Sequence, residues 1–211
     1  MHDSRSGGAL AGFRAIRSDR LMSTVTFAWM ILLVGMGVGI VADRPIAAAF
    51  GADGAGFGLM LAVYGVGAVA GSWFARRLTA ATEPAALTGG LAVAGVAGVV
   101  IGLAGSFEIV LACNLAWGMG DAATTVARQG ILQRRTPDAL RGRVAAANDS
   151  TAHGALIVGF MTAGLLVDAF GAQGAYAVGG VAALVAAAMC GSVVAASQRH
   201  HRCRSAESIH P

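Results

Sequence analysis

The chain has 211 residues and a formal net charge of +4, and it is 56% hydrophobic but only 12% charged. Soluble domains carry about 25% charged residues, so the composition argues against a soluble globular protein. All of its basic residues are arginine. No RNA- or DNA-binding motif accompanies them, so the positive charge does not indicate a nucleic-acid partner.

The chain begins with a basic leader, residues 1–20. Leu10, Phe13 and Ile16 are separated there by arginines, a pattern that predicts an interfacial helix. The apolar run that follows, 21–42, is longer than the 7–15 residues of a signal-peptide core. We therefore expect this run to be retained as a first membrane span.

Five further apolar stretches follow, each near the roughly 20 residues needed to cross a hydrocarbon core. They are residues 56–75, 85–104, 108–127, 144–167 and 175–196. Such stretches must be helical in lipid, because no water is present to satisfy the backbone. We predict an all-α membrane protein, a bundle of six transmembrane helices, followed by a basic tail at 197–211. The Asp-Arg-Pro triplet at 43–45 is expected to be the solvated outer end of the first helix; a charged gate pair is the alternative.

Arginine alternates between the two sides of this arrangement. Fourteen of the fifteen arginines lie in the leader, the loop around 76–77, the loop 128–143 and the tail, and the other loops hold only Arg44. By the positive-inside rule the arginine-rich side is cytoplasmic. The pattern predicts a multi-pass protein of the plasma membrane (the inner membrane of a bacterial cell) with both termini in the cytoplasm. Within 128–143, Thr136 is expected to cap a short interfacial helix that begins at Pro137.

The fourth span carries polar residues at helical spacing. Asn114, Asp121, Thr125 and Arg128 follow one another at intervals of 7, 4 and 3, which places them on one face. If Arg128 marks the cytoplasmic boundary, Asp121 lies about 10 Å inside it. This pattern favours either a solvated cavity or a proton-handling site, or else a contact of Asp121 with Thr125 or Arg128 that only fixes helix packing.

The fifth span has a polar cluster near its start. Asp149 and His153 are one helical turn apart, and His153 lies about 15 Å from Arg143, near the middle of the membrane. A carboxylate and an imidazole at this spacing suit a proton relay, because histidine titrates near neutral pH. The alternative is a vestibule wall with no titrating role.

Two tryptophans, Trp29 and Trp117, lie well inside the first and fourth spans. They are candidates for a pocket that receives an apolar cation, although aromatic side chains in a bundle core more often serve packing. Small residues four apart, at 67 and 71 and at 98 and 102, indicate close helix contacts.

Motifs for enzymatic chemistry are missing from the sequence. It holds no P-loop, HExxH, CxxC or GxSxG motif, and Cys113, Cys190 and Cys203 lack metal-ligand spacing. Ser150, with Asp149 and His153, supplies the residue types of a nucleophilic triad, but all three lie on one helical segment. We therefore expect no enzyme, no metal and no cofactor.

Three segments resemble the major facilitator superfamily of transporters, and in particular bacterial drug, macrolide and siderophore exporters. AFGADGAGFGLMLAVYGVGAVAGSWFARRL, at 49–78, is similar to their seventh-to-eighth helix region, and LQRRTPDALRGRV, at 132–144, to their loop between helices ten and eleven. AGFRAIRSDRLMSTV, at 11–25, resembles the linker that enters helix seven. The likeness covers roughly residues 10–196. One departure is GSWFARRL, at 71–78, which lacks the acid that the family often has there, and this argues against a gating ion pair at that loop.

The resemblance implies half of a proton-coupled exporter of small amphipathic molecules. Full members have twelve spans in two halves with the site between them, so a second six-helix half is expected as partner, from another copy or a separate chain. The resemblance makes Asp121, Asp149 and His153 candidates for proton or substrate contact, and Arg141 and Arg143 candidates for cytoplasmic loop contacts. The alternative is a non-transporting remnant or a regulatory partner subunit of a full-length transporter.

Overall fold

The computed structural model describes residues 12–207, and every regular element in this part of the chain is helical. The elements are α2 (Arg20–Ala49), α3 (Asp53–Ala75), α4 (Glu83–Gly102), α5 (Phe107–Arg135), the 3-10 helix η1 (Asp138–Leu140) and α6 (Arg141–Glu207). Residues 12–18 form a further short helix ahead of α2. The predicted all-α class is confirmed. Residues 1–11 of the expected leader and 208–211 of the expected tail lie outside the described residues.

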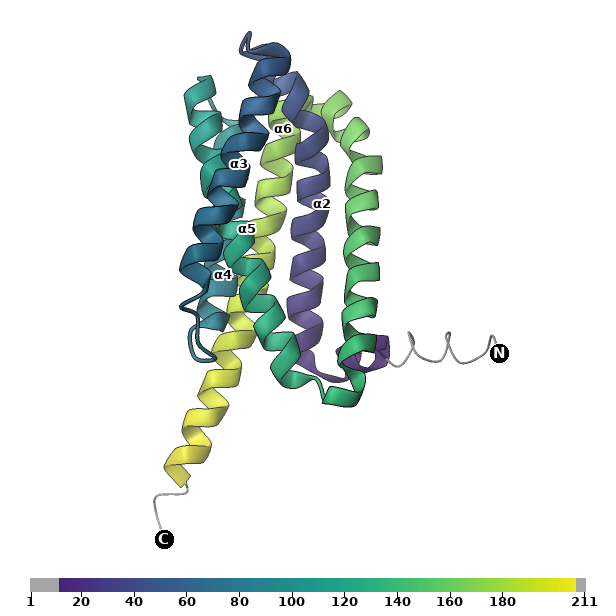
Figure 1. The fold of residues 1–211 in the computed structure, drawn as a ribbon, viewed down its shortest axis with the longest axis vertical. Helices are drawn as coiled ribbons and strands as arrows, with labels where there is room; N and C mark the ends of the chain where they lie inside the picture. Colours follow the sequence, from purple (N-terminus) through teal and green to yellow (C-terminus); the bar gives the residue numbers. More distant parts are fainter. Residues whose placement is uncertain (1–11, 208–211) are drawn as a thin grey trace, which may run out of the picture.

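Helix α6 consists of two antiparallel limbs that meet at one residue. Gly171 has φ 71° and ψ 170°, outside the helical region, and glycine reaches a positive φ without a steric penalty. Figure 1 shows the green limb rising to this point and the yellow limb returning beside α2. Five helices of the described chain are long and apolar enough to cross a membrane, and α6 is one of them. Because α6 is divided, the bundle has six membrane-length rods, as predicted.

Glycines set the contacts between neighbouring rods. A Cβ added to Gly67 or Gly71 of α3 would collide with the backbone of α5, and one added to Gly98 would meet Gly180 in the second limb of α6. Similarly, α2 approaches the first limb through Gly37 and Gly159. Small residues let helix backbones approach closely in lipid, where dispersion forces replace the hydrophobic effect as the drive for association. The glycine pairs expected from the sequence are therefore real contact positions.

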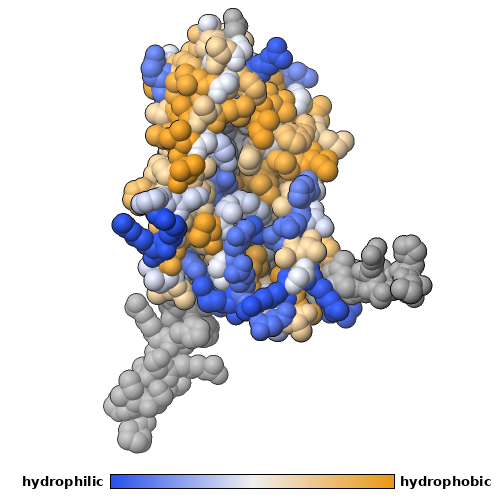
Figure 2. Space-filling model, in the orientation of Figure 1, coloured by the Kyte–Doolittle hydropathy of each residue, from blue (hydrophilic) through white to orange (hydrophobic). Residues whose placement is uncertain are grey.

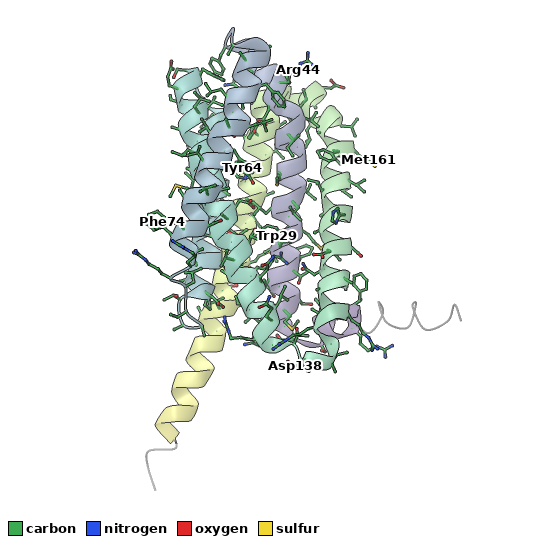
Figure 3. All side chains as sticks on the ribbon, viewed as in Figure 1. Trp29, Arg44, Tyr64, Phe74, Asp138 and Met161 are labelled. Carbon is green, nitrogen blue, oxygen red and sulfur yellow. The ribbon has the colours of Figure 1, made fainter. Side chains whose placement is uncertain are left out.

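Apolar side chains cover the outside of the bundle. Figure 3 shows Phe74 of α3 and Met161 of α6 pointing away from the other helices, and both side chains are exposed. In Figure 2 hydrophobic residues dominate the upper part of the visible face, whereas hydrophilic residues gather in its lower half. This distribution fits a bundle whose upper part is surrounded by lipid.

The lower end of the bundle is tied together by ion pairs. Among the described residues they are Arg134–Glu83, Arg135–Asp19 at 2.7 Å and Arg141–Asp138 at 3.0 Å. The first joins α5 to the start of α4, so this end has an interhelical ion pair although the stretch 71–78 lacks an acid. The second involves Asp19, whose carboxylate also accepts hydrogen bonds from the first amides of α2.

Two helix ends differ from the sequence-based expectation. Helix α2 does not end at 43–45 but continues through Pro45 to Ala49. Helix α5 extends past Arg128 to Arg135, and the expected interfacial helix is only the single turn η1. The hydroxyl of Thr136 donates back to Leu132 O at 2.7 Å, so it closes α5 rather than capping the next helix.

Candidate functional site

A part-buried hydrogen bond joins two helices of the bundle. The hydroxyl of Tyr64, on α3, donates to Oδ2 of Asp121 at 2.7 Å (Tyr64 is labelled in Figure 3). Asp121 is the middle residue of α5, about 21 Å from either end at 1.5 Å per residue. The partner of this carboxylate is therefore Tyr64 rather than Thr125 or Arg128, and it lies deeper within its helix than the sequence suggested.

The guanidinium of Arg128 is inside the bundle and not at its boundary. Arg128 is only 5% exposed, and its Cζ lies 4.5 Å from the ring centroid of Trp29 on α2, within the range of a cation–π interaction. Its Nε and Nη1 atoms have no hydrogen-bond partner among the described residues. Asp121 and Asp149 are near enough to attract its charge, but among the described residues neither forms an ion pair with it. The expected boundary residue is thus a buried, incompletely paired cation.

A cavity of about 240 Å³ adjoins this arginine at the junction of α5 and α6. Its lining is mostly polar side chains and includes Arg128, Gln129, Gln133, Thr136, Arg141, Asn148 and Asp149. Asn148 is buried, and its Oδ1 has no partner among the described residues. The cavity is therefore lined by polar residues of both helices, while the unpartnered Oδ1 of Asn148 is itself closed to solvent.

The pair of residues expected to relay protons lies on the outer surface of the first limb of α6. The side chains of Asp149 and His153 are both exposed. Nδ1 of His153 is 2.7 Å from the backbone oxygen of Asp149, so the imidazole donates to the main chain and not to the carboxylate. Ser150 donates to Ala146 O at 2.8 Å and makes no triad with these two residues.

A second, smaller cavity lies farther from the arginine-rich end. It measures about 90 Å³ and is lined by Met36, Gly39, Ile40, Asp43, Leu61, Tyr64, Asn114, Trp117 and Tyr176. Tyr176 donates to the carboxylate of the buried Asp43, and the ring of Trp117 meets Tyr176 edge-on with centroids 5.8 Å apart. Asn114 donates to Val110 O within its own helix. This cavity combines apolar walls with a carboxylate, two hydroxyls and an amide, the mixed lining common in ligand pockets.

These two cavities lie inside a chain that matches a known family over most of its length. The family model described as the Major Facilitator Superfamily matches residues 22–207. The chain belongs to the Major Facilitator Superfamily. No curated protein and no solved structure matches it. Membership of this transporter superfamily supports membrane transport as the general function and a multi-pass membrane location.

In this superfamily member the predicted site residues divide into two groups. Asn114 and Trp117 line the smaller cavity, while Arg128, Arg141 and Asp149 line the larger one. Asp121 is linked to the smaller cavity through Tyr64. The other four predicted residues also lie outside both linings: Thr125, Arg143 and His153, and Trp29, which instead packs on Arg128.

Sequence reasoning missed three polar residues that the superfamily fold brings into the bundle: Asp43, Tyr64 and Tyr176. Tyr64 and Tyr176 are the only tyrosines of the chain, and both lie in apolar stretches. Buried tyrosine hydroxyls usually find a partner, so their positions were a usable signal. In the described part of the chain no group of three or more His, Cys, Asp or Glu side chains is placed to hold a metal ion.

Proposed function

We propose that this chain forms one half of a transporter that exports small amphipathic molecules across the plasma membrane in exchange for protons. The observation that carries this proposal is the smaller cavity, whose walls pair apolar side chains with Asp43 and with Tyr64, the partner of Asp121. An amphipathic molecule needs both kinds of wall. Two carboxylates held by tyrosine hydroxyls within the bundle supply groups that can exchange protons.

The polar surface of the first α6 limb supports a second half as partner. Asp149 and His153 are exposed on a membrane-length helix, next to a polar cavity that opens between α5 and α6. Ionisable side chains are costly against lipid tails, so this surface favours contact with water or protein. Alternating access is a rocking of two halves about a central site, and a second six-helix half would complete such a site here.

The distribution of arginine supports an orientation with both ends of the described chain on the cytoplasmic side. The connections at 76–82 and 136–140 and both ends of the described chain lie at the lower end in Figure 1. Trp73 stacks on Arg76 there, with Cζ 3.7 Å from the ring centroid, and the side chain of Trp73 is exposed. An exposed tryptophan beside arginines is typical of a membrane interface.

The transport proposal is tested by reconstituting the purified chain in liposomes with an imposed pH gradient. Rhodamine 6G, a fluorescent amphipathic molecule, is the probe, and its gradient-driven movement is followed over time. Asp121→Asn removes the titratable group but keeps the shape, so we expect it to reduce proton-driven flux at least tenfold. Asp168→Asn is the matched control and should leave the flux unchanged. Asp168 is exposed and lies close to Gly171, where the first limb of α6 ends.

The partner is tested by the mass of the detergent-solubilised protein, measured by light scattering with correction for bound detergent. A dimer, together with flux, supports two copies forming one pathway. A monomer that carries no flux and purifies without another chain contradicts the transporter. That result favours the alternative, a non-transporting remnant or a regulatory partner of a full-length transporter.

A further inference from the structure

The smaller cavity holds a carboxylate that no basic residue of the described chain balances. Asp43 lines this cavity and is 4% exposed. Tyr176 donates a hydrogen bond to Oδ1 of Asp43, whereas Oδ2 has no partner among the described residues and is not closed to solvent. The ion pairs of that part of the chain involve other acids. Because an unpaired charge inside a membrane bundle is costly, this carboxylate leaves a place for a cation.

The other walls of the smaller cavity suit a cation that carries alkyl groups. Three aromatic rings, those of Tyr64, Trp117 and Tyr176, belong to the lining, and the last two stand at 88° with centroids 5.8 Å apart. Aromatic rings attract cations, tryptophan most strongly, and walls of this kind recognise methylated ammonium groups. The side chains of Met36 and Leu61 add apolar surface for the alkyl groups. Hard metal ions prefer a shell made wholly of oxygen, and these walls are mostly carbon.

The size of the cavity limits what can enter it. It measures about 90 Å³, whereas an engineered apolar cavity of about 150 Å³ holds one benzene molecule. There is room for a compact head group but not for a whole drug-sized molecule, so the rest of an amphipathic ligand would lie outside. Gly39 helps to set this shape: a Cβ there would come within 3.1 Å of the hydroxyl of Tyr176. The close approach leaves the tyrosine beside Asp43.

We propose that the smaller cavity binds the alkylated ammonium head group of an amphipathic cation. This inference rests on the proposed function and narrows its substrates, because Asp43 attracts a positive head group and repels an anionic one. Tyr64 is hydrogen-bonded to Asp121, so a second carboxylate lies behind that wall and adds negative charge when it is ionised. The larger cavity differs in charge, since Arg128 and Arg141 belong to its lining.

The test is titration calorimetry of the full chain in dodecyl maltoside, an uncharged detergent. The probes are benzyltrimethylammonium, choline, and 3,3-dimethylbutan-1-ol, which is the uncharged carbon isostere of choline. We expect both ammonium probes to bind saturably and choline to bind at least tenfold more tightly than its isostere.

Substitutions in the lining should separate the charge from the shape. Asp43→Asn keeps the shape and removes the charge, so it should weaken binding of both ammonium probes at least tenfold and leave binding of the isostere nearly unchanged. Trp117→Leu should weaken ammonium binding several-fold, because the ring that faces the cation is lost. Asp168→Asn, an exposed carboxylate outside the cavity, is the matched control and should change nothing.

The comparison of choline with its isostere uses the wild-type chain, so it decides the matter even if Asp43→Asn does not fold. Equal affinity for these two probes, absence of saturation with both ammonium probes, or equal binding by wild type and Asp43→Asn would overturn the inference. Failure of the proposed function has a different signature. Ammonium binding without proton-driven flux contradicts the transporter and keeps this binding site, whereas flux of rhodamine 6G in a chain that binds neither ammonium probe does the reverse.

Discussion

The hydroxyl of Tyr64 and the carboxylate of Asp121 form a 2.7 Å hydrogen bond that joins α3 to the middle of α5. The same two helices also approach closely beside it, where a Cβ on Gly118 would collide with the carbonyl oxygen of Tyr64. The polar bond is therefore built into a tightly packed apolar contact. Both of its residues depend on the other helix for their position.

Tyr64→Phe and Asp121→Ala should be energetically coupled. Each substitution removes the bond, so the double variant should lose less stability than the sum of the two single ones. Hydrogen bonds between membrane helices contribute about 0.6 kcal/mol on average and up to about 1.7 kcal/mol. A double-mutant cycle from reversible unfolding in detergent measures the coupling. Strict additivity would show that the bond contributes nothing to the folded state.

Two glycines on opposite sides of α3 should respond differently to the same change. A Cβ at Gly67 would collide with Leu115 O on α5, whereas Gly65 faces open space. Gly67→Ala should destabilise the bundle by about 1–3 kcal/mol through overpacking. Gly65→Ala should be neutral or stabilising by up to about 1 kcal/mol, because alanine is the better helix former. Melting temperatures of the two variants in the same detergent give the comparison, and equal shifts would argue against the close α3–α5 contact.

The carboxylate of Asp19 should make the stability of the start of α2 depend on pH. Partial burial raises the pKa of Asp19, but the hydrogen bonds from Arg135 and from the backbone amides of Met22 and Leu21 outweigh it and lower the pKa below its usual value. Because the pKa of Asp19 is lower in the folded than in the unfolded chain, its carboxylate stabilises the fold fully at pH values above the unfolded-state pKa near 3.8. This stabilisation is lost as the pH falls through the folded-state pKa.

Asp19→Ala should accordingly reduce stability by about 0.5–2 kcal/mol at neutral pH, and by progressively less below pH 4. Asp19→Asn is the matched control, since it keeps a capping oxygen and loses only the charge that faces Arg135. Unfolding by denaturant at several pH values, with wild type alongside, measures both effects. A difference between wild type and Asp19→Ala that does not change with pH would contradict the assigned role of the carboxylate.

The reversal of α6 should tolerate only glycine at its centre. Gly171 has φ 71°, and an alanine there would cost roughly 1–2 kcal/mol because the left-handed conformation brings its Cβ against the backbone. Gly164→Ala, in the first limb of the same helix with open space around it, is the control and should not destabilise. Thermal unfolding of the two variants measures the difference. Equal stability would mean that the chain reverses elsewhere.

Hydropathy was sufficient to predict the helical architecture. Apolar runs of about 20 residues must become helices in lipid, and each run lies within a helix, apart from residues 103–104 at the end of the third, although α2 and α5 extend beyond theirs. The glycine spacing also gave true contact positions, since Gly67 and Gly98 both touch a neighbouring helix. These features depend on local composition, which a single sequence displays directly.

The contacts of the candidate site depend on pairings that local patterns do not contain. Asp43 accepts a hydrogen bond from Tyr176, which is far away in the sequence, in α6. The residues around Asp43 do not reveal this partner, so the Asp-Arg-Pro triplet was interpreted as a solvated helix end. Arg128 was assigned to the boundary because arginine usually marks the cytoplasmic edge, yet Trp29 and the length of α5 place it inside the bundle. In both cases a tertiary partner outweighed the usual solvation preference of the residue.

The single-residue reversal at Gly171 has a consequence for access to the protein. Within residues 12–207, the connections at the end opposite the arginines comprise only 50–52, 103–106 and this one residue, and Gln173 ties 103–106 down through a 2.8 Å hydrogen bond to Ala104 O. That end therefore offers few loop residues to a protease or an antibody. A water-soluble modifying enzyme therefore finds the longer connections, 76–82 and 136–140, at the arginine-rich end.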